Sequence, residues 1–534
     1  MCELNFFDSN CVIGKQVRWQ PGQLESAEQL LAEMDHYGIA ESMVLHAMGR
    51  QNHPIDGNRE VLKVTANHPR LHPAWTALPA GVVDEQPEPE LFLEQMRQNK
   101  VGALYLYPNQ YKFTLDDWCI DDLLAPLADA GVPVVIDPVE STGGIAYGQD
   151  GTDWNALVKL CRRFPNLPVV VSERRIRRSQ RTMFKAFEAC DNLHIDISAP
   201  WLHRCIEFMT DKFGAKRLIF GSHWPDFGQH MTLAMLVHAE ISDDDKQQIA
   251  GDNWRNMIKW CEPEHPTVTK TPPADEYVRF GRTGEKFEDM QFDDCHAHIG
   301  ETSAHYYLND TSTDQLIKLM DSFAINQTCI FNLTGIFCQS EPGNDIVTDA
   351  VKRYPERIVG FTLVNPHTGP EEMLAELERG YANGHRAVKL HPSYQGYPEN
   401  GPNNIDVACQ WVHDHQQLIL NHYWGNHENM QRLVETYPNA LFITGHTTTD
   451  YADIMKKHDN LYVCSCPLLD PRSCERVVDA IGADRFMFGS DMVDLPVAWG
   501  LGPILFAHIS PKEKDLILGG NLRRLLKKYS LVTQ

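Results

Sequence analysis

The sequence predicts an α/β protein built from two tandem (β/α)8 TIM-type barrels joined by a proline-rich linker. Three observations lead to this prediction: an internal repeat, a regular alternation of short apolar runs with amphipathic stretches, and a repeat length near 250 residues. Strands that alternate with helices form right-handed βαβ units and a parallel sheet. About 250 residues is the usual size of one such barrel.

The repeat is visible as matching positions in the two halves of the chain. Gly-Asn at 57–58 recurs at 343–344, an offset of 286, and Phe-Gly-Ser at 220–222 recurs at 488–490, an offset of 268. The order of the matches is kept and the offset only falls, as expected of two copies that differ in the lengths of their loops.

The region between the copies predicts the domain boundaries. Four prolines fall within 263–273, and no apolar periodicity follows them. Such a composition favours an extended connector. We therefore expect a first barrel over residues 1–262, a linker over 263–288 and a second barrel over 289–534.

Eight short apolar runs in the second copy are predicted to be strands. The amphipathic stretches between them, such as 313–323 and 371–382, are predicted to be helices because their apolar residues recur every three or four positions. The strands are expected near Phe292 and at 328–333, 358–364, 387–390, 418–420, 441–444, 461–464 and 486–489.

Composition argues against several classes of function. The chain has 48 Lys and Arg against 72 Asp and Glu, a formal charge of −24, so it repels nucleic-acid backbones and anionic membrane surfaces. No apolar run approaches the roughly 18–20 residues of a membrane span, and no secretory signal pattern opens the sequence. The 14 cysteines form no CxxC pair, which favours free thiols. We expect a cytoplasmic protein that acts on a small molecule.

Metal-binding residue types gather at the predicted strand ends of the second copy, where barrel active sites form. The first strand ends in His296-x-His298, and residues i and i+2 of a strand point to one side. The fifth and sixth strands end in His422 and His446, and Asp491 follows the eighth. A single histidine there is more often structural, but this series favours ligands, because Zn²⁺ and similar ions bind neutral imidazoles and carboxylates.

These residues, together with Lys-Leu-His-Pro at 389–392 and Phe-Gly-Ser-Asp at 488–491, resemble the amidohydrolase superfamily. The most similar branch is the amidohydrolase-related group that includes aminocarboxymuconate-semialdehyde decarboxylase. The resemblance implies that His446 polarises the substrate or moves protons. It also implies one metal ion with four ligands: His296, His298, His422 and Asp491.

A physical argument supports this division of roles. A divalent ion can lower the pKa of bound water to roughly 7, and Asp491 stands where a carboxylate would accept the proton. The imidazole of His446, outside the ligand set, would stabilise developing charge. We expect one Zn²⁺, with Mn²⁺ or Fe²⁺ as alternatives.

The fourth strand carries Lys389 and His391, whose spacing lets both face the pocket. We expect both to bind an anionic group of the substrate; a purely structural role is the alternative for His391. Some superfamily members carry a carboxylated lysine in this strand that bridges two metals, so a second ion at Lys389 is a further alternative. Cys464 and Cys466 have the same spacing, and we interpret them as buried filler rather than ligands.

The first copy has lost these ligands. Asn10 and Val12 stand at the places of the first-strand histidines, a proline stands at the place of the fifth-strand histidine, and His223 replaces the aspartate. Valine and proline side chains cannot bind a metal. The first copy is therefore predicted to be a barrel without its own metal, a pseudo-enzyme. A residual site from Glu173, His223 and Asp226 is the alternative.

The main functional hypothesis is a metal-dependent hydrolase of a small carboxylated amide or lactone, acting through a metal-activated water. A lyase at the same site, either a decarboxylase or a hydratase, is the first alternative. An inactive scaffold or binding protein is the second. Relatives in this branch often work as dimers of barrels, so a homo-oligomer is also an expectation.

Overall fold

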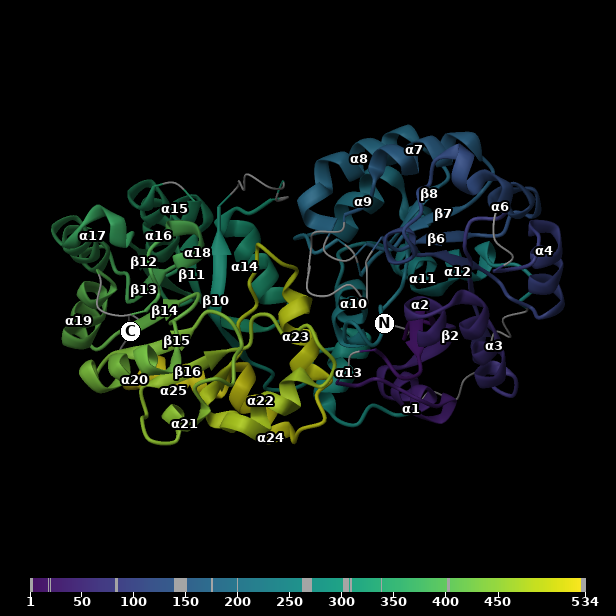
Figure 1. Ribbon diagram of the computed structural model, residues 1–534. Helices are drawn as coiled ribbons and strands as arrows, with labels where there is room; N and C mark the ends of the chain where they lie inside the picture. The colour runs from purple at the N-terminus through teal and green to yellow at the C-terminus, as the bar shows by residue number, and fades with distance from the viewer. Residues whose placement is uncertain are drawn as a thin grey trace. The chain divides into compact units, whose positions relative to one another are not determined.

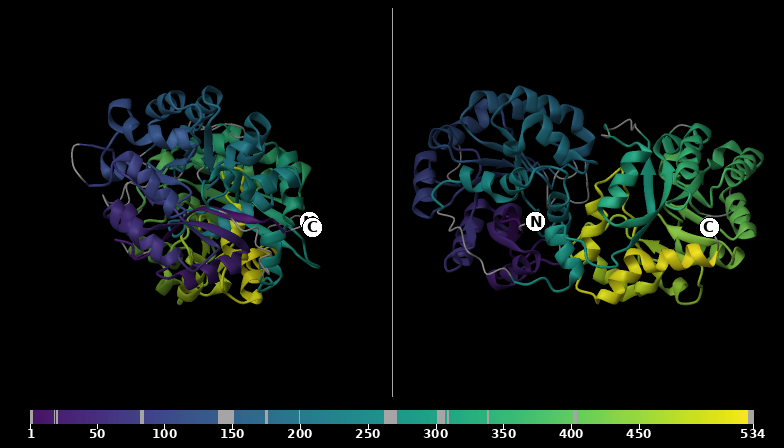
Figure 2. Two further views of the ribbon diagram at one scale, coloured as in Figure 1. Left: turned by 90° about the vertical axis from the view of Figure 1, so that its right-hand side faces the viewer. Right: turned by 180° about the vertical axis from the view of Figure 1, so that it is seen from behind.

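The computed structural model divides the chain into two compact units, Met1–Glu285 and Lys286–Gln534 (Figures 1 and 2). Each unit has the α/β fold with parallel strands that the sequence predicts for both copies. The structure describes residues 3–17, 19, 21–81, 85–138, 151–173, 176–198, 200–261, 271–300, 307, 310–337, 339–400 and 404–529.

The C-terminal unit contains one sheet of eight parallel strands in chain order, which confirms the predicted barrel (Figure 1). Backbone hydrogen bonds from Cys295 N to Phe488 O and from Asp491 N to His296 O, both 2.9 Å, join the first strand to the residues that follow the last. The sheet therefore closes on itself. Its strands are β10 (Phe292–Ile299), β11 (Ile325–Asn332), β12 (Ile358–Leu363), β13 (Ala387–Leu390), β14 (Leu418–Asn421), β15 (Leu441–Thr444), β16 (Leu461–Cys464) and β17 (Phe486–Met487).

Helices alternate with these strands and lie on the outside of the barrel (Figure 1). In α14 (Thr313–Ser322), the Ser312 side chain caps the first turn by accepting from Gln315 N, and Leu316 and Met320 are buried at helical spacing. The others are α15 (Leu333–Phe337), α16 (Ser340–Arg353), η4 (Pro366–Thr368), α17 (Pro370–Ala382), α18 (Pro392–Gln395), α19 (Ile405–His415), α20 (His427–Thr436), α21 (Ala452–Met455), α22 (Ser473–Ile481), η5 (Ala483–Arg485), α23 (Val497–Leu505), α24 (Pro511–Asp515), η6 (Leu516–Gly520) and α25 (Asn521–Lys528).

The N-terminal unit repeats this order, with its strands in two parallel sheets, β1-β2-β3 and β4 to β9. The two sheets separate at Ala74, but the N–H of Ala74 still donates to Val44 O at 2.9 Å. At the other junction, between β1 and the residues after β9, Ser9 N donates to Phe220 O at 3.0 Å. The strands are β1 (Phe6–Ile13), β2 (Ile39–His46), β3 (Leu71–Pro73), β4 (Trp75–Thr76), β5 (Leu104–Leu106), β6 (Val134–Ile136), β7 (Val169–Val171), β8 (Leu193–Asp196) and β9 (Leu218–Ile219).

The helices of the N-terminal unit follow the same alternation with its strands. They are α1 (Ala27–Tyr37), α2 (Ala47–Gln51), α3 (Pro54–Thr65), α4 (Pro89–Gln98), α5 (Pro108–Tyr111), α6 (Asp117–Ala130), α7 (Trp154–Arg163), η1 (Ile176–Ser179), α8 (Gln180–Ala189), α9 (Cys205–Phe213), η2 (Ala215–Arg217), α10 (Gln229–Val237), α11 (Asp243–Gln247), η3 (Gln248–Asp252), α12 (Asn253–Met257) and α13 (Glu276–Thr283).

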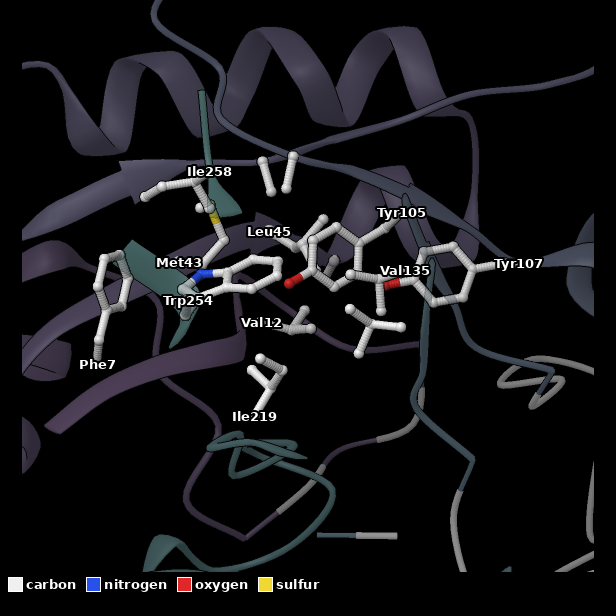
Figure 3. Packing of buried hydrophobic residues seen from close by; sticks show 14 residues of the cluster. Phe7, Val12, Met43, Leu45, Tyr105, Tyr107, Val135, Ile219, Trp254 and Ile258 are labelled. Atoms are coloured by element: carbon white, nitrogen blue, oxygen red, sulfur yellow. The ribbon is translucent and has the colours of Figure 1, made fainter. Parts of the chain in front are cut away.

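Apolar and aromatic side chains from strands of the N-terminal barrel, and from α12 and the residue after it, form one buried cluster (Figure 3). Val12 from β1 and Tyr105 from β5 belong to it, and each is no more than 2% exposed. The cluster also includes Phe7, Met43, Leu45, Tyr107, Val135, Ile219, Trp254 and Ile258.

Equivalent hydrogen bonds in the two units confirm the tandem duplication. Asp8 accepts from the N–H of Ser222 at 2.9 Å and from its hydroxyl at 2.6 Å. Asp294 accepts from the same two groups of Ser490, at 3.0 and 2.5 Å. Each pair ties the first strand of its barrel to the residues after the last strand, so the two copies share this closing contact.

The linker was expected to be extended throughout, and this expectation is wrong for its second half. Residues 276–283 form α13, which Asp275 caps by accepting from Val278 N at 2.8 Å. Val278 and Phe280 are buried, and the Phe280 ring lies 4.6 Å from the ring of His238, centroid to centroid. This single amphipathic helix belongs to the N-terminal unit, which ends at Glu285 rather than at residue 262. Residues 263–270 of the expected linker lie outside the described residues.

Within the ranges given above, every helix is too short or too polar to cross a membrane.

Candidate metal centre

The carboxyl end of β10 carries the first two predicted ligands. His296 is 0% and His298 is 5% exposed, and their ring centroids lie 5.2 Å apart. The register of β10 against β11 shifts between Asp294 and Ala297, which is the signature of a bulge that re-aims side chains. The Asp294 carboxylate holds this bulge by accepting from His296 N at 3.0 Å. Burial raises the pKa of Asp294 to about 7.

Asp491 lies where the last strand meets the first, within reach of both histidines. Its Oδ1 is 3.6 Å from His296 Nε2 and 3.3 Å from His298 Nδ1. The residue has a φ of +58°, a left-handed conformation that costs an L-amino acid about 1–2 kcal/mol. The equivalent residue of the N-terminal unit, His223, has a φ of +56°, so this conformation belongs to the closing turn that both barrels share.

The separations of Asp491 from the two histidines suit ligands on a divalent cation. Two nitrogen or oxygen ligands at 2.0–2.2 Å from a tetrahedral ion lie about 3.4 Å apart, close to both separations above. His296 Nε2 and His298 Nδ1 are buried and have no hydrogen-bond partner among the described residues. A buried polar atom left unsatisfied costs about 1–3 kcal/mol, and a bound cation would remove that cost.

Burial also holds the imidazoles in the form that a metal binds. It lowers the pKa of His296 and of His422 well below the ordinary value, and it lowers the pKa of His298 although the Asp491 carboxylate opposes the shift. Neutral histidines have a free nitrogen lone pair at physiological pH. The site can therefore take up a cation without first losing protons from these rings.

Cys466 is a further member of this cluster that the sequence analysis interpreted as filler. Its sulfur, a nitrogen of His296 and a carboxylate oxygen of Asp491 all lie within 4.8 Å of one another. Cys464, two residues earlier on β16, places its sulfur 3.7 Å from His296 Nδ1. The only sequence signal for Cys466 was its spacing from Cys464, which is equally common in buried strands.

The predicted fourth ligand, His422, lies between the histidine pair of β10 and two other histidines. Its ring centroid is 6.3 Å from that of His296, and its ring stacks on His391 at 3.8 Å with 21° between the planes. Its Nε2 is also in contact with Nε2 of His446. The histidines at the ends of β10, β13, β14 and β15 therefore form one continuous row.

Lys389 on β13 is completely buried beside this row. Its Nζ lies 4.3 Å from the centroid of the Phe331 ring and has no hydrogen-bond partner in the part of the chain that the structure describes. Burial lowers the pKa of Lys389 to about 7, and the Asp491 carboxylate opposes the shift. Burial, followed by the charge of Lys389, lowers the pKa of His391 to about 2.

The corresponding positions of the N-terminal unit are occupied differently. Asn10 donates to Ser172 Oγ at 2.9 Å, and the same hydroxyl lies 2.7 Å from His223 Nε2. Glu173 accepts from Thr152 N at 2.9 Å. Val12 belongs to the apolar cluster of Figure 3. The residues at these positions are engaged with one another or with the core.

Arg50, which sequence reasoning missed, lies at the same end of the N-terminal barrel. It is 2% exposed, forms an ion pair with Asp226, and places Nη2 4.0 Å from Asp137 Oδ2. Its guanidinium therefore supplies positive charge to two buried carboxylates. The sequence around residue 50 contains no pattern that would indicate a buried arginine.

Comparisons with known proteins place both units in one group. A sequence model of the family described as Amidohydrolase matches residues 20–257 and 293–528. No curated protein sequence matches the chain.

Solved structures similar to the chain include three enzymes, each of which covers about half of it. 2,6-Dihydroxybenzoate decarboxylase from Rhizobium is 15% identical, with a TM-score of 0.37 over 45% of this chain and 99% of its own. 4-Oxalomesaconate hydratase from Rhodopseudomonas palustris is 14% identical, with 0.36 over 45% and 97%. A probable 2-pyrone-4,6-dicarboxylic acid hydrolase from Acinetobacter baumannii is 15% identical, with 0.35 over 45% and 100%.

Proposed function

Since the chain belongs to the amidohydrolase family over both of its repeats, we propose that its C-terminal unit is a metal-dependent hydrolase of a small carboxylated amide or lactone. The observation that carries the proposal is that two buried histidines, His296 and His298, each place a ring nitrogen within 3.6 Å of Asp491 Oδ1, as ligands on one ion would. We propose one Zn²⁺ as the resident metal, with Mn²⁺ or Fe²⁺ as alternatives.

A divalent ion bound there supplies Lewis-acid chemistry, polarising a carbonyl oxygen and acidifying water. Asp491 is the general base in this proposal: it takes a proton from the attacking water and returns it to the leaving group. His446 donates a hydrogen bond to the oxygen on which negative charge develops. His422 lies in contact with His446 and with His391, so it orients the proton-carrying ring besides serving as the fourth proposed ligand.

Lys389 and His391 are the proposed binding groups for the carboxylate of the substrate. A buried ammonium without a hydrogen-bond partner gains most from an anion, because the surrounding medium screens their attraction weakly. A bound carboxylate would raise the pKa of Lys389 again, so the lysine binds the substrate as a cation.

The N-terminal unit is the proposed pseudo-enzyme. Its apolar cluster includes Val12 at the place of a ligand, and the Arg50 guanidinium supplies positive charge among the carboxylates. We propose the cytoplasm as the site of action, because every cysteine that the structure describes is a free thiol. A homo-oligomer remains part of the proposal.

Metal analysis and product analysis test the function together. The protein is purified without chelator, its metal content is measured per chain, and a panel of small carboxylated amides and lactones is offered in ¹⁸O-labelled water. One ion per chain and ¹⁸O in a new carboxyl group support a hydrolase. Carbon dioxide or a dehydrated acid as product contradicts it in favour of a lyase, and a metal-free protein contradicts it in favour of a scaffold.

A further inference from the structure

The seventh strand of the C-terminal barrel contributes a thiol to the proposed metal cluster. Cys466 is 2% exposed, and its sulfur lies within 4.8 Å of both a His296 nitrogen and an Asp491 oxygen. Among the described residues, this is the group of three potential ligands whose atoms all approach one another this closely.

A second, independent observation indicates that a ligand belongs at this point. His296 is completely buried, and its Nε2 has no hydrogen-bond partner within the described ranges. The other nitrogen, Nδ1, is occupied by Cys464 at 3.7 Å. With Nδ1–H as the donor to that sulfur, Nε2 keeps its lone pair and is the nitrogen that can bind a metal. Nε2 therefore points toward the space that it shares with Asp491.

We propose that Cys466 is a thiolate ligand of the metal ion in the C-terminal unit, alongside His296 and Asp491. The inference rests on the proposed function for the existence of the ion, and it adds Cys466 as a fifth residue to the proposed ligands His296, His298, His422 and Asp491. As the metal–sulfur bond forms, the S–H bond of Cys466 breaks and its proton passes to solvent water, with no oxidation or reduction.

The closeness of the three atoms leaves this coordination within reach of a side-chain movement. A Zn–S bond is about 2.3 Å and a Zn–N bond about 2.0–2.1 Å, so sulfur and nitrogen ligands that subtend about 90–109° at the ion lie about 3.1–3.6 Å apart. The Cys466 sulfur lies within 4.8 Å of both partners, so coordination needs its side chain to approach by no more than about 1–2 Å. A thiolate is a soft ligand and favours Zn²⁺ over Mn²⁺, so Cys466 bears on which metal the protein selects.

Cobalt substitution of the full-length protein tests the proposal without any substrate. Thiolate bound to Co²⁺ gives an intense near-ultraviolet charge-transfer band that imidazole and carboxylate ligands lack. We expect this band in the wild-type protein and in the matched control Cys464→Ser, and its loss in Cys466→Ser. We also expect the dissociation constant for Zn²⁺, measured by competition with a chelating dye, to rise at least about tenfold in Cys466→Ser.

Each outcome bears on a different claim. A Co²⁺-loaded wild type without the band, or a band that persists in Cys466→Ser, overturns the thiolate ligand while leaving the proposed hydrolase intact. A band with no hydrolysis of any substrate supports the ligand and overturns the function, and a protein that binds no metal overturns both. Should Cys466→Ser fail to fold, X-ray absorption of the zinc-loaded wild type decides, with a sulfur neighbour at about 2.3 Å expected and its absence contradictory.

Discussion

Replacing Lys389 by methionine is expected to stabilise the metal-free protein. The ammonium is completely buried over the Phe331 ring and has no hydrogen-bond partner among the described residues. Methionine keeps most of the length and volume of the lysine side chain and removes the charge. The folded protein then no longer has to keep an ionisable group away from water.

The size of the effect follows from the pKa of Lys389, which burial lowers from 10.5 to about 7. Each pKa unit corresponds to about 1.4 kcal/mol, so a charged Lys389 in the folded state costs about 5 kcal/mol relative to the unfolded chain. Between pH 7 and 10.5 the unfolded chain binds more protons than the folded one, and the unfolding free energy of the wild type therefore rises with pH. Lys389→Met has no such dependence. Its advantage of about 5 kcal/mol at pH 6 should fall to about 2 kcal/mol at pH 9.

Urea unfolding of chelator-treated protein at pH 6 and pH 9 measures this difference. The control Lys318→Met, at an exposed position of α14, should change the unfolding free energy by no more than about 0.5 kcal/mol at either pH. A Lys389→Met protein that is less stable than the wild type at pH 6, or whose advantage does not shrink at pH 9, would refute the reasoning. The same variant should lose affinity for a carboxylated substrate.

Four further results are expected. Asp491→Asn should abolish metal binding and hydrolysis while the far-ultraviolet circular dichroism stays unchanged; a fully loaded variant would contradict its role. His223→Ala should lower stability by about 1–3 kcal/mol through its lost contact with Ser172 and leave hydrolysis unchanged, and a loss of activity would assign the N-terminal unit a part in the reaction. Ser490→Ala and its counterpart Ser222→Ala should each lower the free energy of unfolding in urea titrations by about 1–3 kcal/mol. Only Ser490→Ala should weaken Zn²⁺ binding, and equal effects of the two substitutions on Zn²⁺ binding would contradict a single metal site. Dialysis against a chelator should remove activity, and added Zn²⁺ should restore it; activity that survives dialysis would argue against a metal enzyme.

The sequence predicted the barrel of the C-terminal unit nearly strand by strand. The predicted strands at 387–390, 441–444 and 461–464 coincide with β13, β15 and β16. Strands that are buried on both faces appear in the sequence as short continuous apolar runs. The helices between them are recognisable because their apolar residues recur every three or four positions. The family was also predicted, from the histidine pair at 296 and 298 and the residues at 488–491, and is confirmed over both repeats.

Other features leave little trace in a single sequence. Val278 and Phe280 form the buried face of a helix only eight residues long, which proline-rich sequence precedes, so its period was missed. The same residue type serves either as filler or as ligand: Cys466 could be distinguished from Cys464 only once the structure placed its sulfur near Asp491. Arg50 was missed because burial of an arginine depends on carboxylates that are far away in the sequence. Long-range contacts of this kind are set by the closed fold and not by local pattern.

Anomalous diffraction from crystals of the zinc-loaded protein tests the central claim most directly. One strong peak at the zinc absorption edge is expected, in the C-terminal unit, within bonding distance of His296, His298 and Asp491. A crystal soaked in Zn²⁺ that shows no peak there, or that shows its strongest peak in the N-terminal unit, would contradict the account.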